Sequence, residues 1–222
     1  MNIYTRQFRF IFSKLILSMI LLPASFNVYA NNVNNITSEV KSYITGIKSI
    51  AVEFVQKDSG GKSARGMLII DKPHKFRCNY YEPFPILIVG NVNYISLYDF
   101  EMNNLSRVKA EENIFNFLLV DNIDFDDKLE IMSAKEKGDE YIIRVNSREL
   151  NKISEIIFDK KTKDIKIMRI FEENNLITLT FGKTRQITNI ASSLFILKDP
   201  DIYGKPERLN KDNLEKKFNI VR

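Results

Sequence analysis

The side chains that enzymes use most often are scarce in this chain. It has a single histidine, His74, in an exposed-looking turn beside Pro73, and a single cysteine, Cys78. A hydrolase of the Ser-His-Asp or Cys-His type is therefore possible only through His74, where a nucleophile, a base and an orienting group would have to converge. One histidine and one cysteine do not make a metal-binding cluster. We predict no catalytic residues, no metal and no cofactor.

The remaining polar residues also favour a binding protein over an enzyme. The carboxylate pairs Glu111-Glu112 and Asp126-Asp127 lie in polar stretches and are typical of solvated surface. The sequence contains no glycine-rich phosphate-binding loop. Phenylalanine and isoleucine are abundant while tryptophan is absent, which favours a deformable apolar interior over a carbohydrate platform. The chemistry indicated is the burial of apolar groups.

The first thirty residues have the pattern of a secretory signal. Residues 1–14 carry Arg6, Arg9 and Lys14 with no acidic residue, residues 15–22 are apolar, and a small residue follows at Ala30. The apolar run is shorter than the ~20 residues that a membrane span needs. We therefore predict cleavage after Ala30, leaving residues 31–222 as a single extracytoplasmic domain.

Charge and cysteine content bear on partners and on stability. The formal net charge of +5 includes the three basic residues of the signal, so the mature chain is close to neutral and gives no case for nucleic-acid binding. The lone Cys78 cannot form an intrachain disulfide, so packing must stabilise the fold. We expect Cys78 to be a small buried apolar residue.

Most of the mature chain has the pattern of short antiparallel strands. An amphipathic helix is expected over residues 35–47, a helical turn over 113–119 and a short helix within 210–218. Short polar turns separate the strands, which favours antiparallel hairpins. The strands expected from alternation and composition are residues 49–57, 67–70, 75–81, 86–89, 94–98, 105–108, 129–134, 140–145, 153–159, 165–171, 176–187 and 194–197.

The stretch from Gly66 to Pro83 is predicted to form two neighbouring strands, around which the other elements are arranged. Its second strand places Phe76, Cys78 and Tyr80 on an apolar face. The opposite face, expected to be exposed to water, carries Lys75, Arg77, Asn79 and Tyr81. Its first strand is apolar on both faces and must be covered on both sides. A sheet this long has to curl, so we predict a mainly β (α+β) fold in which helices close a barrel or half-barrel. Residues 113–119 fit a plug or lid equally well as ordinary core.

Several ordered features resemble the outer-membrane lipoprotein carrier protein family (LolA). These are the first helix, the strand ending Phe54-Val55-Gln56, then Gly66, the block of residues 72–77, and residues 80–83. The resemblance continues through residues 86–89 and 93–98, and in a closing strand at Phe195 before Pro200. The first half of the mature chain matches the family well. The second half matches it in the regular succession of hairpins and in length.

The resemblance implies an unclosed antiparallel β-barrel with a helical lid over a hydrophobic cavity. It implies a periplasmic chaperone that takes lipoproteins from an inner-membrane lipoprotein-releasing ABC complex to an outer-membrane receptor, binding their acyl chains, and a monomer. The family's arginine latch for the lid falls on Lys72, which lacks the planar fork of arginine, so Arg77 or Arg65 could substitute. The family's cargo-transfer aromatic falls on Phe76, and Cys78 stands where the family often has tryptophan.

The residues expected to line or cover the acyl-chain site are the apolar side chains of one face of the first strands and of the 113–119 turn. They are Ile50, Val52, Phe54, Leu68, Ile70, Phe76, Ile86, Ile88 and Phe115, with Lys72 and Arg77 as the expected lid latch. Two rival functions remain open. One is a periplasmic sensor or regulatory module of the same half-barrel type, and the other is a lipid hydrolase that depends on His74.

Overall fold

The computed structural model describes residues 25–110, 116–121, 129–148 and 150–221. The chain forms two compact units, residues 1–35 and 36–222. The described part of the first unit is the start of helix α1 (Ser25–Gly46). Within the described residues, no helix combines the length and the apolar character needed to cross a membrane.

Helix α1 begins at Ser25, well before the predicted start at residue 35, and ends at Gly46. From Ile36 onward its apolar stripe is buried as predicted, because Ile36, Val40, Tyr43 and Ile44 recur at helical spacing on one face. Tyr43 packs against the rings of Tyr141 and Phe158, with ring centroids 6.3 and 6.4 Å apart. The part of α1 that belongs to the second unit, from Ile36 to Gly46, therefore packs on the sheet of the same unit.

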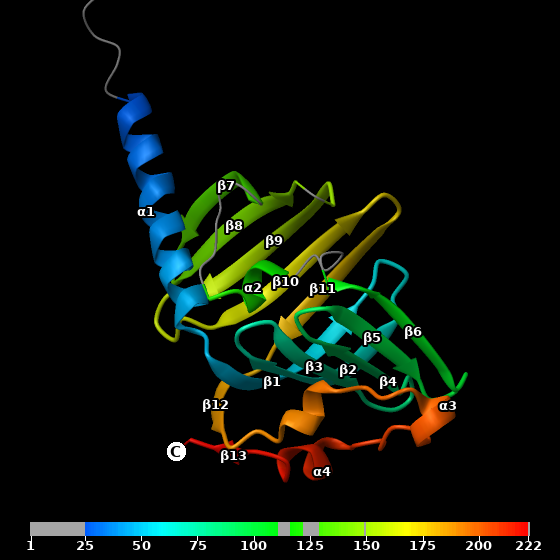
Figure 1. The fold of residues 1–222 in the computed structure, drawn as a ribbon. Helices are drawn as coiled ribbons and strands as arrows, with labels where there is room; N and C mark the ends of the chain where they lie inside the picture. Colours follow the sequence, from blue (N-terminus) through cyan, green and yellow to red (C-terminus); the bar gives the residue numbers. More distant parts are fainter. Residues whose placement is uncertain (1–24, 111–115, 122–128, 149, 222) are drawn as a thin grey trace, which may run out of the picture. The chain divides into compact units, whose positions relative to one another are not determined.

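One antiparallel sheet dominates the second unit (Figure 1). The strands of its main path run in the order β6-β5-β4-β3-β2-β1-β11-β10-β9-β8-β7, with β12 and β13 off the path. In the described part of the chain β6 and β7 are the two ends of that path, so the sheet is not closed. The strands are β1 (Ser49–Lys57), β2 (Ser63–Asp71), β3 (Lys75–Tyr80), β4 (Ile86–Gly90), β5 (Tyr94–Asp99), β6 (Asn104–Lys109), β7 (Leu129–Lys137), β8 (Glu140–Ser147), β9 (Lys152–Asp159), β10 (Ile165–Glu172), β11 (Asn175–Phe181), β12 (Arg185–Thr188) and β13 (Asn219–Ile220).

The predicted mainly β architecture, an unclosed half-barrel with helices, is confirmed, with two local corrections. The strand predicted over residues 176–187 breaks at Gly182–Thr184, because β11 pairs with the end of β1 and β12 with its start. The strand predicted over residues 194–197 is wrong. Residues Ser192–Phe195 form a 3₁₀ helix, η3, because Leu194 and Phe195 turn inward to be buried together.

The segment from Arg185 to Ile220, which we name the C-terminal strap, packs across the outer face of β1–β5 (Figure 1). It contains β12, η3, α3 (Pro200–Tyr203), α4 (Lys211–Glu215) and β13. It buries Met67 and Ile69 of β2 beneath Leu214 and Phe218, while Leu68 and Ile70 face the opposite, inner side. The prediction that β2 is covered on both sides is therefore confirmed.

The face of β3 that was predicted to be wet is buried under the strap. Arg77 is 5% exposed and Asn79 is 2% exposed. Arg77 donates through Nη1 to the carbonyl of Leu194 at 3.1 Å, and the Asn79 amide donates to the carbonyl of Leu209 at 3.4 Å. Polar side chains occupy this buried face because the strap's own carbonyls need donors there.

Candidate functional site: an apolar cavity in two compartments

The inner face of the curved sheet carries the apolar side chains that alternate with the residues under the strap. Strand alternation places Ile50, Val52 and Phe54 of β1 on this face beside Leu68 and Ile70 of β2, which pair with them. The same face continues through β3–β5 on one side and through β10 and β11 on the other. An unclosed, curved sheet therefore presents a continuous apolar surface.

A cavity of ≈ 450 Å³, the inner compartment, lies on this face, within the ~300–1,000 Å³ range of small-molecule sites. Its walls are almost entirely apolar. The lining residues are Phe54, Gln56, Leu68, Ile70, Phe76, Cys78, Tyr80, Ile88, Ile95, Leu118, Leu119, Met168, Ile170, Ile177, Leu179 and Phe181.

None of the three polar side chains of the inner compartment, Gln56, Cys78 and Tyr80, carries a charge. Tyr80 donates its hydroxyl to Oε1 of Gln56 at 2.7 Å, and its ring packs edge-on against Phe54 at 5.1 Å. Burial raises the pKa of the Cys78 thiol to about 12, and burial likewise raises the pKa of Tyr80. Both groups stay protonated at neutral pH, so neither presents a charge to an apolar ligand.

A second cavity of ≈ 380 Å³, the outer compartment, adjoins the first. The two compartments share the walls formed by Leu68, Ile70, Leu118 and Phe181. The outer compartment has an apolar floor that includes Ile50 and Val52, but its rim is polar. The polar rim residues are Ser42 from the last turns of α1, Thr162, Lys163 and Asp164 from the β9–β10 turn, and Thr184 and Gln186 near β12.

The short helix α2 (Asn116–Leu119) lies over the inner face. Leu119 packs with Ile50 and Ile70, and the His74 backbone N–H donates to the Leu119 carbonyl at 2.9 Å. Leu118 lines both compartments. Helix α2 is therefore a wall of the cavity, which favours the plug or lid interpretation of this segment over ordinary core.

The structure brings most of the residues predicted for the acyl-chain site together. Five of them, Phe54, Leu68, Ile70, Phe76 and Ile88, line the inner compartment, and Ile50 and Val52 line the outer one. Ile86 lies on the same side of β4 as Ile88 but is not among the lining residues, and Phe115 lies outside the described residues.

The sequence prediction missed the half of the wall that comes from β10 and β11. These residues are Met168, Ile170, Ile177, Leu179 and Phe181. The alternation of apolar residues with Thr178 and Thr180 along β11 was a visible signal, whereas β10 has apolar residues on both faces. What it did not reveal is that β11 pairs with β1, which brings these strands next to the first half of the chain.

Lys72 holds the end of α1. Its Nζ donates to the carbonyl of Ile44 at 2.6 Å, and its backbone N–H donates to the carbonyl of Lys48 at 3.0 Å. The last carbonyls of a helix have no partner within the helix and carry partial negative charge, so an ammonium is a suitable donor there. Burial lowers the pKa of Lys72 to about 8, against an opposing effect of Asp121.

Neither arginine considered as a substitute latch reaches the helix. Arg77 is on the outer face of β3, where it bonds to Asn79 and to the strap. Arg65 pairs with Val55, near the end of the β1–β2 ladder away from Lys72. The expectation of a lid latch at Arg77 is corrected because strand alternation points its side chain away from α1.

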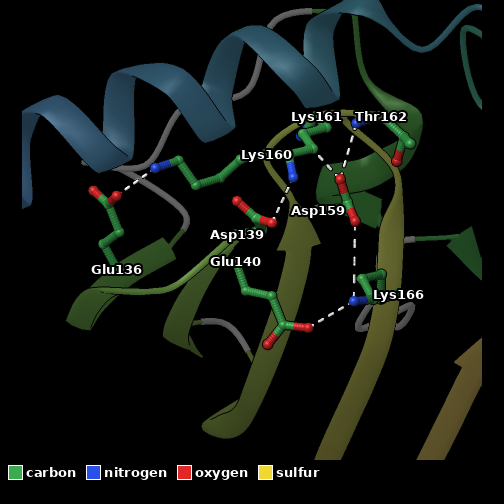
Figure 2. A network of polar contacts seen from close by, with 8 residues as sticks. All are labelled: Glu136, Asp139, Glu140, Asp159, Lys160, Lys161, Thr162 and Lys166. Carbon is green, nitrogen blue, oxygen red and sulfur yellow. Dashed lines mark hydrogen bonds and ion pairs between the residues drawn. The ribbon is translucent and has the colours of Figure 1, made fainter.

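Charged residues fix the turn that carries half of the polar rim, as Figure 2 shows. The Asp159 carboxylate accepts from the backbone N–H groups of Lys161 and Thr162, each at 2.9 Å, and these bonds lower its pKa. Lys160, Lys161 and Lys166 then pair with carboxylates of the neighbouring β7–β8 hairpin. The pairs are Lys160 with Glu136, Lys161 with Asp139 at 2.7 Å, and Lys166 with Glu140 at 2.7 Å.

Sequence comparison gives one family and several relatives. The family model for the outer membrane lipoprotein carrier protein LolA matches residues 45–198. A protein of uncharacterised function from Rickettsia prowazekii is 46% identical over 195 residues, which cover 88% of this chain and 91% of the relative. An outer-membrane lipoprotein carrier protein from Chromobacterium violaceum is 26% identical over 172 residues, covering 73% of this chain and 83% of the relative.

Comparison with solved structures finds a similar protein of low sequence identity. The crystal structure of a LolA superfamily protein from Nitrosomonas europaea aligns with 74% of this chain and 97% of its own, with a TM-score of 0.46 and 7% identity.

Proposed function

The chain belongs to the LolA family of outer-membrane lipoprotein carrier proteins, and from that premise we propose that it is a periplasmic chaperone for lipoproteins. In this proposal residues 1–30 are removed on export. The mature protein binds the acyl chains of lipoproteins released from the inner membrane and carries them to the outer membrane. The observation that carries the proposal is the ≈ 450 Å³ inner compartment, walled almost entirely by apolar side chains.

The energetics of the cargo require such a site. Each buried methylene contributes about 0.8 kcal/mol, so a lipid anchor of some forty methylenes costs on the order of 30 kcal/mol to leave in water. A cavity lined by isoleucine, leucine and phenylalanine binds chains by burial alone, without directional bonds. Such binding tolerates different acyl chains, which suits a carrier of many lipoproteins.

The two helices beside the cavity act as its lid in this proposal. The last turns of α1 line the outer compartment, Leu118 of α2 lines both compartments, and Leu119 of α2 lines the inner one. Lys72 latches α1 through the Ile44 carbonyl. An incoming acyl chain displaces the lid, so the free energy of lid closure reduces the net affinity for cargo.

The partners in this proposal are a releasing ABC complex in the inner membrane and a receptor at the outer membrane. Transfer runs in one direction only if the receptor binds the acyl chains more strongly than the carrier does. A lid that closes over the emptied cavity favours release, because closure lowers the free energy of the unloaded carrier.

The direct test is release of a radiolabelled lipoprotein from spheroplasts by the purified protein, followed by transfer to outer-membrane vesicles. The wild-type protein is expected to bring lipoprotein into the supernatant and then deliver it. Ile177→Asp places a charge on the inner compartment and is expected to reduce release at least tenfold, because an unpaired carboxylate in an apolar site is costly.

The matched control is Ile202→Asp, the same change on α3 at a side chain that is 73% exposed. It is expected to leave release unchanged. Failure of the wild-type protein to release lipoprotein, or equal release by both variants, would contradict the carrier function. Release without any onward delivery would favour the sensor or regulatory module instead.

A further inference from the structure

We propose that the outer compartment is a head-group subsite. It binds the uncharged ester and amide groups of a diacylglyceryl-modified cysteine, while the acyl chains occupy the inner compartment. This inference rests on the proposed function and extends it. The subsite gives the cargo one orientation and selects among lipids that carry the same acyl chains.

The first observation is that the two compartments adjoin but differ in polarity. They share Leu68, Ile70, Leu118 and Phe181 as walls, so one extended molecule that displaces these side chains reaches both. The polar groups of the inner compartment already bond to one another or stay neutral. An amphiphile therefore places its chains in the inner compartment and its polar end in the outer one.

The second observation is the supply of hydrogen-bonding groups at the rim. Thr184 and Ser42 each bring a hydroxyl, and Gln186 brings an amide with both donors and acceptors. Ester carbonyls accept hydrogen bonds and the amide N–H of a modified cysteine donates one. The rim therefore offers hydrogen-bond donors to the ester carbonyls and an acceptor to the amide N–H of such a head group.

The third observation is the balance of charge at the rim. The β9–β10 turn contributes one cation, Lys163, and one anion, Asp164. The ammonium of Lys163 lies 5.4 Å from the ring centroid of Tyr43, which keeps it against α1. Lys72 is not a rim residue, and its ammonium already donates to the Ile44 carbonyl. A rim with one charge of each sign favours a neutral head over the phosphate of a phospholipid.

The fourth observation is that the turn is held in place before any ligand arrives. The Asp159 carboxylate accepts hydrogen bonds from the backbone of the turn, and the lysines of Figure 2 add surface ion pairs to the β7–β8 hairpin. Lys163 adopts φ 63°, and its N–H donates to the Asp159 carbonyl at 2.9 Å. Rim groups fixed in this way lose little conformational freedom on binding, which is what selectivity among head groups requires.

The test is displacement of a fluorescent fatty acid from the full mature protein by three competitors with palmitoyl chains. These are a synthetic dipalmitoyl-glyceryl-cysteine peptide whose amino end is acetylated and whose carboxyl end is amidated, so that its head group is uncharged, together with dipalmitoyl phosphatidylglycerol and palmitate. The lipopeptide is expected to displace the probe at a lower concentration than phosphatidylglycerol does, although the chains are the same.

Two rim variants change the charge balance in opposite directions. Asp164→Asn is expected to raise the affinity for phosphatidylglycerol relative to the lipopeptide by about two- to fivefold, the effect of one exposed charge. Lys163→Gln is expected to lower the affinity for phosphatidylglycerol relative to the lipopeptide by a similar factor. Asp201→Asn makes the same charge change as Asp164→Asn, but on exposed α3 in the strap, and is expected to leave the ratio unchanged.

The outcomes separate this inference from the proposed function. Equal displacement by lipopeptide and phosphatidylglycerol, with no response to the two rim variants, would overturn the head-group subsite and leave acyl-chain binding intact. Failure of all three competitors would overturn both. A shift of equal size in the Asp201→Asn control would show a general charge effect and would likewise overturn the subsite.

Discussion

At the scale of single residues, Lys72 shows how one substitution changes the chemistry of the proposed lid. The family resemblance places an arginine at this position, and the lysine found there still reaches the end of α1 through Nζ. A guanidinium remains charged at all relevant pH values, whereas an ammonium can lose its proton when it is buried. The pKa of Lys72, about 8, brings that loss close to the physiological range.

The Lys72 latch is expected to make stability depend on pH. Its pKa is about 8 in the latched state against 10.5 when exposed, so unlatching or unfolding takes up a proton between these values. By linkage, raising the pH through this window stabilises the latched state, and below pH 8 the contribution is constant. The free energy of unfolding of the wild-type protein relative to Lys72→Met is therefore expected to rise between about pH 7.5 and pH 10.

Urea unfolding of both proteins at the two pH values measures this effect. The other groups that titrate, including Cys78 and the buried tyrosines, are common to both proteins and cancel in the difference. A difference that stays the same at both pH values would mean that the Lys72 ammonium is not buried against the Ile44 carbonyl.

Gly90 sets the position of the Phe76 ring in the cavity wall. The two residues pair across β3 and β4, and a Cβ atom at position 90 would lie 1.8 Å from a ring carbon of Phe76. Gly90→Ala is therefore expected to lower the free energy of unfolding by about 1–3 kcal/mol, the usual cost of overpacking. It is also expected to weaken probe binding, because the ring must turn into the inner compartment.

Two companion variants make the Gly90 prediction specific. At Gly46 nothing lies within 4 Å of an added Cβ, so Gly46→Ala is expected to change stability by less than about 0.5 kcal/mol. The double variant Gly90→Ala with Phe76→Leu removes the ring and is expected to recover part of the loss. Additive losses in the double variant would rule out the Gly90–Phe76 contact as the cause.

Sequence reasoning placed individual side chains well wherever strand alternation alone decides the face. Phe76, Cys78 and Tyr80 share the inner compartment as expected, and Arg77 and Asn79 lie on the other side. It failed where a second segment changes the environment of a face. Nothing local to Arg77 indicates that Leu194, more than a hundred residues later, supplies the carbonyl that it bonds.

At the scale of elements, the C-terminal strap stabilises the sheet from outside, and only Gln186 of β12 among its residues lines the cavity, at the rim of the outer compartment. Leu214 of α4 is fully buried among strap and outer-face residues, while neither compartment is lined by α3, α4 or η3. Leu214→Ala is expected to cost about 2–5 kcal/mol of unfolding free energy through the cavity that it creates. Probe affinity, measured where the variant remains folded, is expected to match that of the wild-type protein.

Ile220→Ala in β13, at a side chain that is 43% exposed, provides the control and is expected to cost much less. Chemical denaturation gives the stability of each variant, and fluorescent fatty-acid titration gives its affinity. A large loss of affinity in folded Leu214→Ala would show that the strap shapes the cavity and is more than a support.

The elements themselves were largely predictable, because hairpins are local. The strand at residues 49–57 was predicted with the bounds of β1, and most other strands were predicted to within a few residues. The strap was predictable only in part. A short helix was expected within residues 210–218, where α4 lies, but η3 and α3 are short and the strap's apolar residues follow no regular period. Its course depends on distant partners, such as the Asn79 amide that binds the carbonyl of Leu209.

At the scale of the whole second unit, pairing of β1 with β11 joins the two series of hairpins into one sheet. This contact brings Phe54 of β1 opposite Phe181 of β11, and so completes the wall of the inner compartment. The regular succession of hairpins predicts that strands adjacent in sequence pair with each other. It does not predict which strands far apart in sequence pair. The family resemblance supplied the expectation of an unclosed barrel that local patterns alone left open.

The proposed carrier function depends on an interior that receives acyl chains. Mass spectrometry under native conditions, on protein prepared from periplasm without detergent, tests this most directly. We predict that the wild-type protein carries bound acylated lipoprotein, or binds one triacylated lipopeptide per chain when it is supplied, and that Ile177→Asp carries none. A wild-type protein that stays empty after incubation with excess lipopeptide would contradict the binding of acyl chains in the inner compartment.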